Sequence, residues 1–217
     1  MDHPRDQHIV ASLREQFGDI DIYLFDQIAR GRVTLEMRIL DAGCGAGRNL
    51  HYLMRTGHQV AGVDESAAAI DATRRLAARF APRLSGAAFR EEPVEHMSFG
   101  DEEFDFVISS AVLHFARDHG HFRAMIDGMW RVLRPNGFLF ARVASTIGMP
   151  AVNFHPVGNC RFRLPDGSER FLVDEAMLMD ETCRLGAQLA DPVKTTVVQN
   201  ARCMTTWCVR KATLLDA

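Results

Sequence analysis

Short apolar runs alternate with segments of helical periodicity along most of this chain. Five runs have the length and the aromatic or β-branched content of buried strands, at residues 37–41, 59–64, 87–91, 104–110 and 138–144. The segments around them place apolar residues three and four positions apart, which predicts helices at 19–30, 49–55, 67–80, 119–133 and 173–185. Strands that alternate with helices predict an α/β fold, a parallel sheet with helices on both faces.

The C-terminal part departs from this alternation. Residues 192–199 and 203–210 are β-branched runs around Asn200-Ala201-Arg202, which predicts a hairpin with one antiparallel strand in the sheet. Residues 145–170 carry repeated Gly, Pro and Asn, and we expect a long loop with at most short structure. Loops of this length inside a compact domain are usually functional or mobile.

Composition narrows the classes of function. The net charge of −3, with both signs interspersed, argues against a nucleic-acid partner. No apolar run approaches the roughly 20 residues of a membrane span, and the first thirty residues lack the apolar core of a secretory signal. The five cysteines are scattered, which favours reduced thiols and a cytoplasmic location.

The segment after the first predicted strand carries the strongest chemical signal. It reads Asp41-Ala42-Gly43-Cys44-Gly45-Ala46-Gly47: an acid, three glycines at alternate positions, then a helix start. Without side chains in the way, such a backbone can press against a ligand. A dinucleotide dehydrogenase more often has Gly-x-Gly-x-x-Gly, and a tight turn that binds nothing is a third interpretation.

A second acid, Asp64, ends the second predicted strand, after Val60-Ala61-Gly62-Val63. A carboxylate in this place can accept both hydroxyl groups of a ribose, so it points to a nucleoside without saying which one. Glu65 follows directly and is a further candidate ligand, with a solvated carboxylate as the alternative.

These two segments resemble motifs I and II of the class I S-adenosylmethionine (SAM) methyltransferases. The resemblance covers about residues 35–210 and includes the stretches 99–107 and 109–115 around the fourth strand. The turn at 133–138 has one glycine where the family often has two. Arg48-Asn49-Leu50 and the closing strand look like a bacterial small-molecule type.

The resemblance implies a Rossmann-like, mostly parallel seven-stranded sheet in the order 3-2-1-4-5-7-6, with the last strand antiparallel. It implies a single domain over residues 1–217, with a helical cover at 1–34 and the 145–170 loop on the substrate side. The implied cofactor is SAM, and the product derived from it is S-adenosyl-L-homocysteine.

The cofactor contacts that follow lie in and after the first four strands. They are Asp41, Gly43, Cys44, Gly45, Gly47, Asn49, Asp64, Glu65, Glu92, Val94, Ser110 and Ala111. Family members often carry an acid near the adenine amino group, and here the Glu92 side chain or the Val94 backbone takes that place. Ser110 and Ala111 are expected near the methyl donor.

Methyl transfer is an in-line displacement, so alignment carries much of the rate and a general base is needed only where the nucleophile must lose a proton. His114 follows the fourth strand, where ligands meet an open α/β sheet, and is the candidate base; a structural histidine is the alternative. Tyr23, His155, Arg161 and Arg202 are candidate substrate contacts, with core packing or solvated surface as their alternatives. No metal site is expected, because His114, His119 and His121 lack a supporting Cys or carboxylate cluster.

The sequence therefore predicts a SAM-dependent methyltransferase that acts on a small molecule, without a nucleic-acid or membrane partner. An NAD(P)-dependent oxidoreductase and a non-catalytic SAM-binding module are the alternatives. The acceptor, its reacting atom and the oligomeric state do not follow from these residues.

Overall fold

Three parallel strands form the sheet of the first of two structural units. The structure, a computed structural model, describes residues 13–199 and 201–212, and divides into the units Met1–Glu92 and Pro93–Ala217. In the first unit, β1 (Arg38–Ala42), β2 (Gln59–Asp64) and β3 (Phe89–Glu91) lie in the order β3-β2-β1. This half of the predicted strand order is confirmed. The first twelve residues of the predicted helical cover lie outside the described part.

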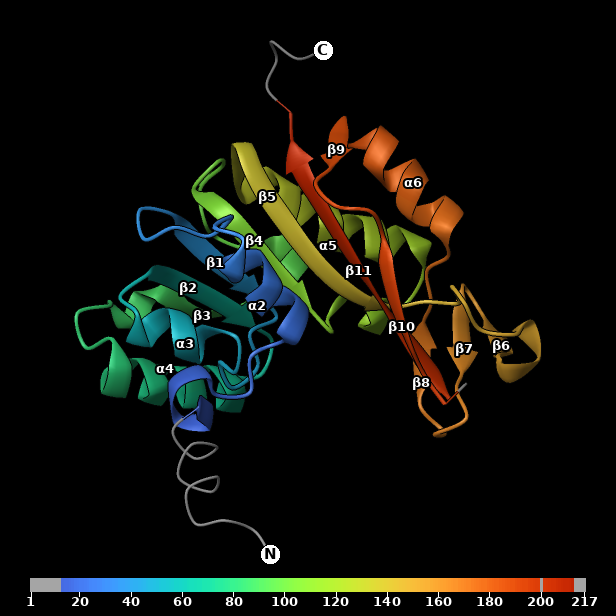
Figure 1. Cartoon of the computed structure of the whole chain (residues 1–217), viewed down its shortest axis with the longest axis horizontal. Coiled ribbons are helices and arrows are strands. Elements are labelled where there is room, and N and C mark those ends of the chain that lie inside the picture. The colour runs from blue at the N-terminus through green and yellow to red at the C-terminus, as the bar shows by residue number, and fades with distance from the viewer. Residues whose placement is uncertain (1–12, 200, 213–217) are drawn as a thin grey trace, which may run out of the picture. The chain divides into compact units, whose positions relative to one another are not determined.

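The helices of the first unit are α2 (Ile22–Ala29), α3 (Leu50–Arg55) and α4 (Ala67–Phe80), with a short 3₁₀ turn, η1 (Gly86–Ala88), before β3. Figure 1 shows α3 and α4 next to β2 and β3, and both helices contact β2. Ser66 caps α4 as predicted, because its hydroxyl accepts the Ala69 N–H at 3.3 Å. Helix α2 begins at Ile22, later than expected, because the extended backbone and side chain of Asp21 make it the N-cap.

The second unit also contains a sheet. Strand β4 (Phe104–Ser110) is parallel to β5 (Leu133–Ala144), while β11 (Arg202–Lys211) is antiparallel to β5 and β10 (Lys194–Val198) is antiparallel to β11. This gives β4-β5-β11-β10, which is the predicted 4-5-7-6 with an antiparallel closing strand. The prediction missed a short additional strand, β9 (Ala187–Leu189), which pairs with β11. Asn200, at the predicted hairpin turn, lies outside the described residues.

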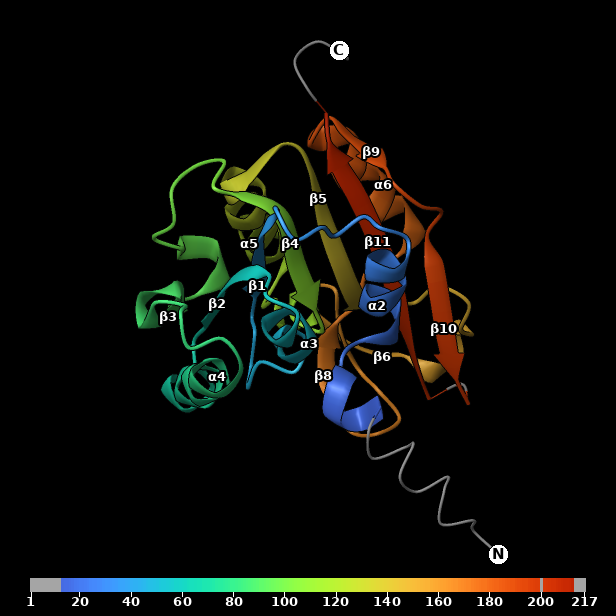
Figure 2. The ribbon, with the colours of Figure 1, turned by 60° about the vertical axis from the view of Figure 1, so that its left-hand side comes forward.

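Two helices support this sheet (Figure 2). Helix α5 (His119–Val132) buries Phe122, Ile126 and Met129, as the predicted helix 119–133 requires, and ends one residue earlier. Helix α6 (Glu175–Arg184) is tied to β11 by the Trp207 indole, which donates to the Thr182 hydroxyl at 3.0 Å. The short 3₁₀ segments are η2 (Val94–His96), η3 (Leu113–Phe115) and η4 (Ala151–Asn153).

Two local predictions were wrong. Residues 145–170 are not an open loop, because β6 (His155–Gly158), β7 (Arg161–Arg163) and β8 (Glu169–Phe171) form a three-stranded antiparallel sheet. The predicted turn at 135–137 is a bulge inside β5: Asn136 has φ 65°, and the pairing with β4 changes register there.

Within residues 13–199 and 201–212, no helix is both long enough and apolar enough to cross a bilayer.

Candidate functional site

The glycine loop after β1 is a backbone cradle held from both sides. Gly43, Gly45 and Gly47 all have positive φ, at 83°, 54° and 81°, which explains why glycine occupies these positions. The Gly43 and Cys44 N–H groups both donate to the Val63 carbonyl at 2.8 Å, which fixes the loop to the end of β2.

Helix α4 contacts the other side of the glycine loop. The Thr73 hydroxyl donates to the Gly45 carbonyl at 2.8 Å, and a Cβ at Gly47 would lie 3.1 Å from the same hydroxyl oxygen. Cys44 is buried, and burial raises the pKa of its thiol, so this side chain packs as a small apolar group. The loop therefore has a fixed shape before any ligand binds.

Asp64 connects this loop to the start of α4. Its Oδ2 accepts the Gly45 N–H at 2.9 Å, and its Oδ1 accepts the Ser66 N–H at 3.0 Å. A carboxylate has about four acceptor sites, so both oxygens keep a lone pair for ligand hydroxyls. The geometry of Asp64 therefore fits the predicted ribose contact. Asp64 also holds the glycine loop against the start of α4, a structural role that the sequence pattern did not indicate. Glu65 beside it is exposed.

Asp41 is the most unusual group in the first unit. Its side chain is fully buried, and within the described residues neither carboxylate oxygen has a hydrogen-bond partner. Burial raises the pKa of Asp41 to about 7, against the opposing effects of Arg48 and Asn49. A buried carboxylate without a donor is a place for a ligand's cationic group, so the residue fits the ammonium of an amino acid moiety.

The remaining candidates of this unit are Asn49, Tyr23 and Glu92. Asn49 is buried, and its amide oxygen accepts the Asp21 N–H at 3.1 Å, so it fixes the start of α2 against the loop. Tyr23 is half-buried on α2. Glu92 is half-buried too, and its N–H donates to the Asp64 carbonyl at 3.1 Å. The sequence pattern gave Asp21 no role.

In the second unit, the chain takes a strained conformation directly after β4. Ala111 has φ 66°, which is uncommon for a residue with a Cβ, and its N–H donates to the Arg142 carbonyl at 2.8 Å. Ser110 and Val94 are buried. Strain of this kind often accompanies a binding site, and here it lies at the carboxyl end of a parallel strand.

A cavity of about 310 Å³ opens beside Ala111 and contains His114. The His114 side chain is 7% exposed, and its Nδ1 has no hydrogen-bond partner in the described residues. Burial, with a further contribution from Arg170, lowers the pKa of His114 to about 4. The imidazole is therefore neutral at pH 7 and can accept a proton.

The walls of this cavity are mixed in character. Its charged residues are Arg142, Arg170, Arg202 and Asp166. Of the predicted substrate contacts in this unit, Arg202 lines the cavity. His155 is exposed on β6, and Arg161 on β7 lies 3.7 Å from Glu169; neither belongs to the lining.

Two arginines of the cavity were missed by the sequence reasoning. Arg142 lies within an apolar run that indicates only a strand. The position of Arg170 depends on the pairing of β8, an element that was not predicted. No sequence signal at either position distinguishes it from a surface arginine.

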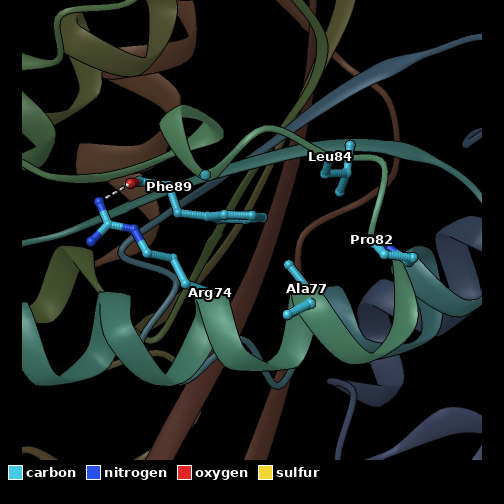
Figure 3. Close-up of a pocket in the computed structure, with 7 residues that line it drawn as sticks. Arg74, Ala77, Pro82, Leu84 and Phe89 are labelled. Atoms are coloured by element: carbon cyan, nitrogen blue, oxygen red, sulfur yellow. Dashed lines mark hydrogen bonds between the residues drawn. The ribbon is translucent and has the colours of Figure 1, made fainter.

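A second cavity, of about 230 Å³, lies in the first unit between α4 and the segment before β3 (Figure 3). Arg74 crosses its edge and donates to the Phe89 carbonyl at 2.8 Å, while Ala77, Pro82 and Leu84 supply apolar walls. It contains none of the predicted site residues. Among the described residues, no group of three or more His, Cys, Asp or Glu side chains could hold a metal ion.

Part of the chain is similar to known proteins. Residues 40–141 match the family model described as a methyltransferase domain. A ubiquinone biosynthesis O-methyltransferase of Nitrobacter winogradskyi is 35% identical over 136 residues, which are 62% of this chain and 49% of that protein. The chain thus spans about half the length of this curated relative, and 40% of another, an uncharacterized methyltransferase of Bacillus subtilis.

Solved structures share the fold along most of the chain. A SAM-dependent methyltransferase from Methanosarcina mazei superposes with a TM-score of 0.69 at 21% identity, over 85% of this chain and 97% of that one. The 1,6-didemethyltoxoflavin-N1-methyltransferase of Burkholderia thailandensis, solved with its substrate and S-adenosylhomocysteine, also gives 0.69, at 18% identity, over 95% and 84%. The Rossmann-like methyltransferase fold is therefore confirmed.

Proposed function

We propose that this chain, whose residues 40–141 match a methyltransferase domain, is a class I SAM-dependent methyltransferase that transfers a methyl group from SAM to a small-molecule acceptor. The observation that carries the proposal is Asp41, a fully buried carboxyl group whose oxygens have no partner within hydrogen-bond distance among the described residues, beside a glycine cradle of fixed shape. No observation favours the oxidoreductase alternative.

Residues of the first unit would hold the cofactor. Asp41 would meet its ammonium group, the glycine loop its amino acid portion, and Asp64 the ribose hydroxyls through the lone pairs that its backbone contacts leave unused. Asn49 would keep the loop in place from α2. Glu92, Val94, Ser110 and Ala111 remain candidate contacts for the adenine and the reacting end, and Cys44 and Glu65 are weaker ones.

The bound cofactor supplies a methyl group on a sulfonium, which is already activated for displacement. The protein must then align the nucleophile and, where necessary, take its proton. His114 is suited to the second task, because its imidazole is neutral at pH 7 and its Nδ1 has no partner within the described residues. The His114 cavity would hold the acceptor, with Arg202 as its proposed contact. Tyr23, His155 and Arg161 remain candidate substrate contacts.

We extend the proposal to the whole chain, which would act as one methyltransferase domain over residues 1–217. The structural neighbours support this, since the likeness covers 85% of the chain or more. A cytoplasmic location is part of the same proposal, supported by five cysteines that are all free.

Cofactor binding is tested by calorimetry with S-adenosyl-L-homocysteine. The wild type should bind it with a dissociation constant on the order of micromolar. Asp64→Ala should lose most of that affinity, whereas Asp71→Ala, which removes an exposed carboxylate from α4, should keep it. Unchanged affinity in the Asp64 variant would remove the ribose assignment, and absence of binding to the wild type would remove the function.

Catalysis is tested with a panel of acceptors, scored by release of S-adenosyl-L-homocysteine. On an acceptor that loses a proton, His114→Ala should lower kcat by about 10²–10⁴-fold with little change in cofactor affinity. His96→Ala, at an exposed position in η2, is the matched control. Cofactor binding without turnover on any acceptor would instead favour the non-catalytic binding module.

A further inference from the structure

The charges of the His114 cavity exceed what methyl transfer itself requires. Three guanidinium groups line it, from Arg142 on β5, Arg170 on β8 and Arg202 on β11, against one carboxylate, Asp166. Hydrogen bonds from Ser168 lower the pKa of Asp166, and the charges of Arg170 and Arg202 lower it further. Three guanidinium groups against one carboxylate leave the cavity with an excess of positive charge, which attracts anions.

At least one of these cations is held in place before any ligand arrives. An Arg170 Nη1 donates to the Glu169 carbonyl at 2.8 Å, and the guanidinium lies over the Phe115 ring at 5.0 Å from its centroid. Phe115 follows His114 directly in η3, so the cation and the candidate base are anchored to the same turn. A guanidinium fixed in this way loses little freedom on binding a carboxylate, which its planar fork matches.

The rest of the lining suits an organic body of limited size. Leu164, Met204 and Ala144 provide apolar surface, and Ser168 and Thr196 provide hydroxyl groups. The volume of about 310 Å³ lies at the lower end of ligand sites, which run from about 300 to 1,000 Å³, so it admits a molecule with roughly one ring.

We propose that the methyl acceptor is a small organic acid whose carboxylate binds Arg170 and Arg202, with its apolar body against Leu164 and Met204 and its nucleophile toward His114. This inference rests on the proposed function. In the reaction, the bond from the nucleophile to the methyl carbon forms as the methyl–sulfur bond breaks, and the electron pair of that bond stays on sulfur. The nucleophile's proton passes to the imidazole, and the carboxylate is unchanged.

The test compares benzoate with benzamide, which has the same shape without the charge. Calorimetry is performed on the full chain saturated with S-adenosyl-L-homocysteine, whose own binding is measured first. Benzoate should bind roughly tenfold or more tightly than benzamide. Arg170→Gln and Arg202→Gln, on different strands, should each weaken benzoate roughly tenfold and leave benzamide and the cofactor product unchanged.

Arg163→Gln is the matched control, since Arg163 lies on the neighbouring strand β7, forms an ion pair with Glu169 and is not part of the lining. Equal binding of benzoate and benzamide, or equal losses in the Arg163 and Arg170 variants, would overturn the inference while cofactor binding upholds the function. Phenyl phosphate that binds roughly tenfold more tightly than benzoate would overturn the carboxylate assignment. Failure of the wild type to bind S-adenosyl-L-homocysteine would overturn both proposals.

Discussion

Replacement of Asp41 by asparagine should stabilise the protein in the absence of ligand, although it removes a residue proposed to bind the cofactor. The Asp41 carboxyl is fully buried without a hydrogen-bond partner in the described residues, and its pKa rises from 3.8 to about 7. The folded state therefore holds a proton that the unfolded chain releases between about pH 4 and 7. Stability falls with rising pH across that window, because there the folded state binds more protons.

The size of the effect follows from the two pKa values. With about 1.4 kcal/mol per pKa unit, ionisation of Asp41 costs the folded state about 4 kcal/mol at pH 8 and about 2 kcal/mol at pH 5. Asparagine has a similar shape and cannot ionise. Asp41→Asn should thus unfold at higher urea concentration than the wild type, with an advantage that grows by about 2–3 kcal/mol from pH 5 to pH 8.

Urea titrations at several pH values, followed by circular dichroism, measure this advantage. Asp71→Asn removes an exposed carboxylate of the same unit and should keep the wild-type dependence of stability on pH. The reasoning is refuted if Asp41→Asn is less stable than the wild type at pH 8, or if its advantage does not change with pH. Added SAM should stabilise the wild type more than the variant, because a bound ammonium gives the carboxylate its missing partner.

Three further predictions concern packing. Glu181→Gln should lower the free energy of unfolding by about 3 kcal/mol in urea titrations, because it leaves two arginines facing a neutral side chain at a fully buried position. Gly128→Ala should lower the melting temperature, since its Cβ would lie 2.4 Å from a backbone oxygen, whereas Gly120→Ala meets only a side-chain atom at 3.3 Å. A thiol reagent should modify the exposed Cys160 and Cys183 before the three buried cysteines, as mass spectrometry of partly labelled protein would show.

Most strands were predictable because a short run of consecutive apolar residues is enough to indicate a buried strand. Residues 104–110 form a buried strand within the limits that the apolar run gives. The N-cap of α4 was predictable for the same reason, because it depends only on the Ser66 hydroxyl and the nearby Ala69 N–H. Such features depend on a few consecutive residues, and the sequence contains them directly.

The segment 145–170 was mispredicted for the opposite reason. Its strands β6, β7 and β8 have only three or four residues each, and the pattern of Gly, Pro and Asn is the same for an open loop and for short hairpins. Pairing between strands, such as that of Phe162 with Arg170, distinguishes short hairpins from an open loop. The His114 cavity includes Arg170 of β8, so this arginine could not be assigned to the cavity from sequence.

Asp41 and His114 each have a buried polar atom without a hydrogen-bond partner among the described residues, and they affect stability with opposite signs. Burial raises the pKa of Asp41 to about 7, so its contribution becomes unfavourable as pH rises from about 4. Burial lowers the pKa of His114 to about 4, so the unfolded chain binds the extra proton and stability is lost as pH falls below about 6.5. Neither arrangement benefits the ligand-free fold. Asp41 remains a carboxyl group that ionises when a cation arrives, and His114 remains a neutral imidazole that can take a proton.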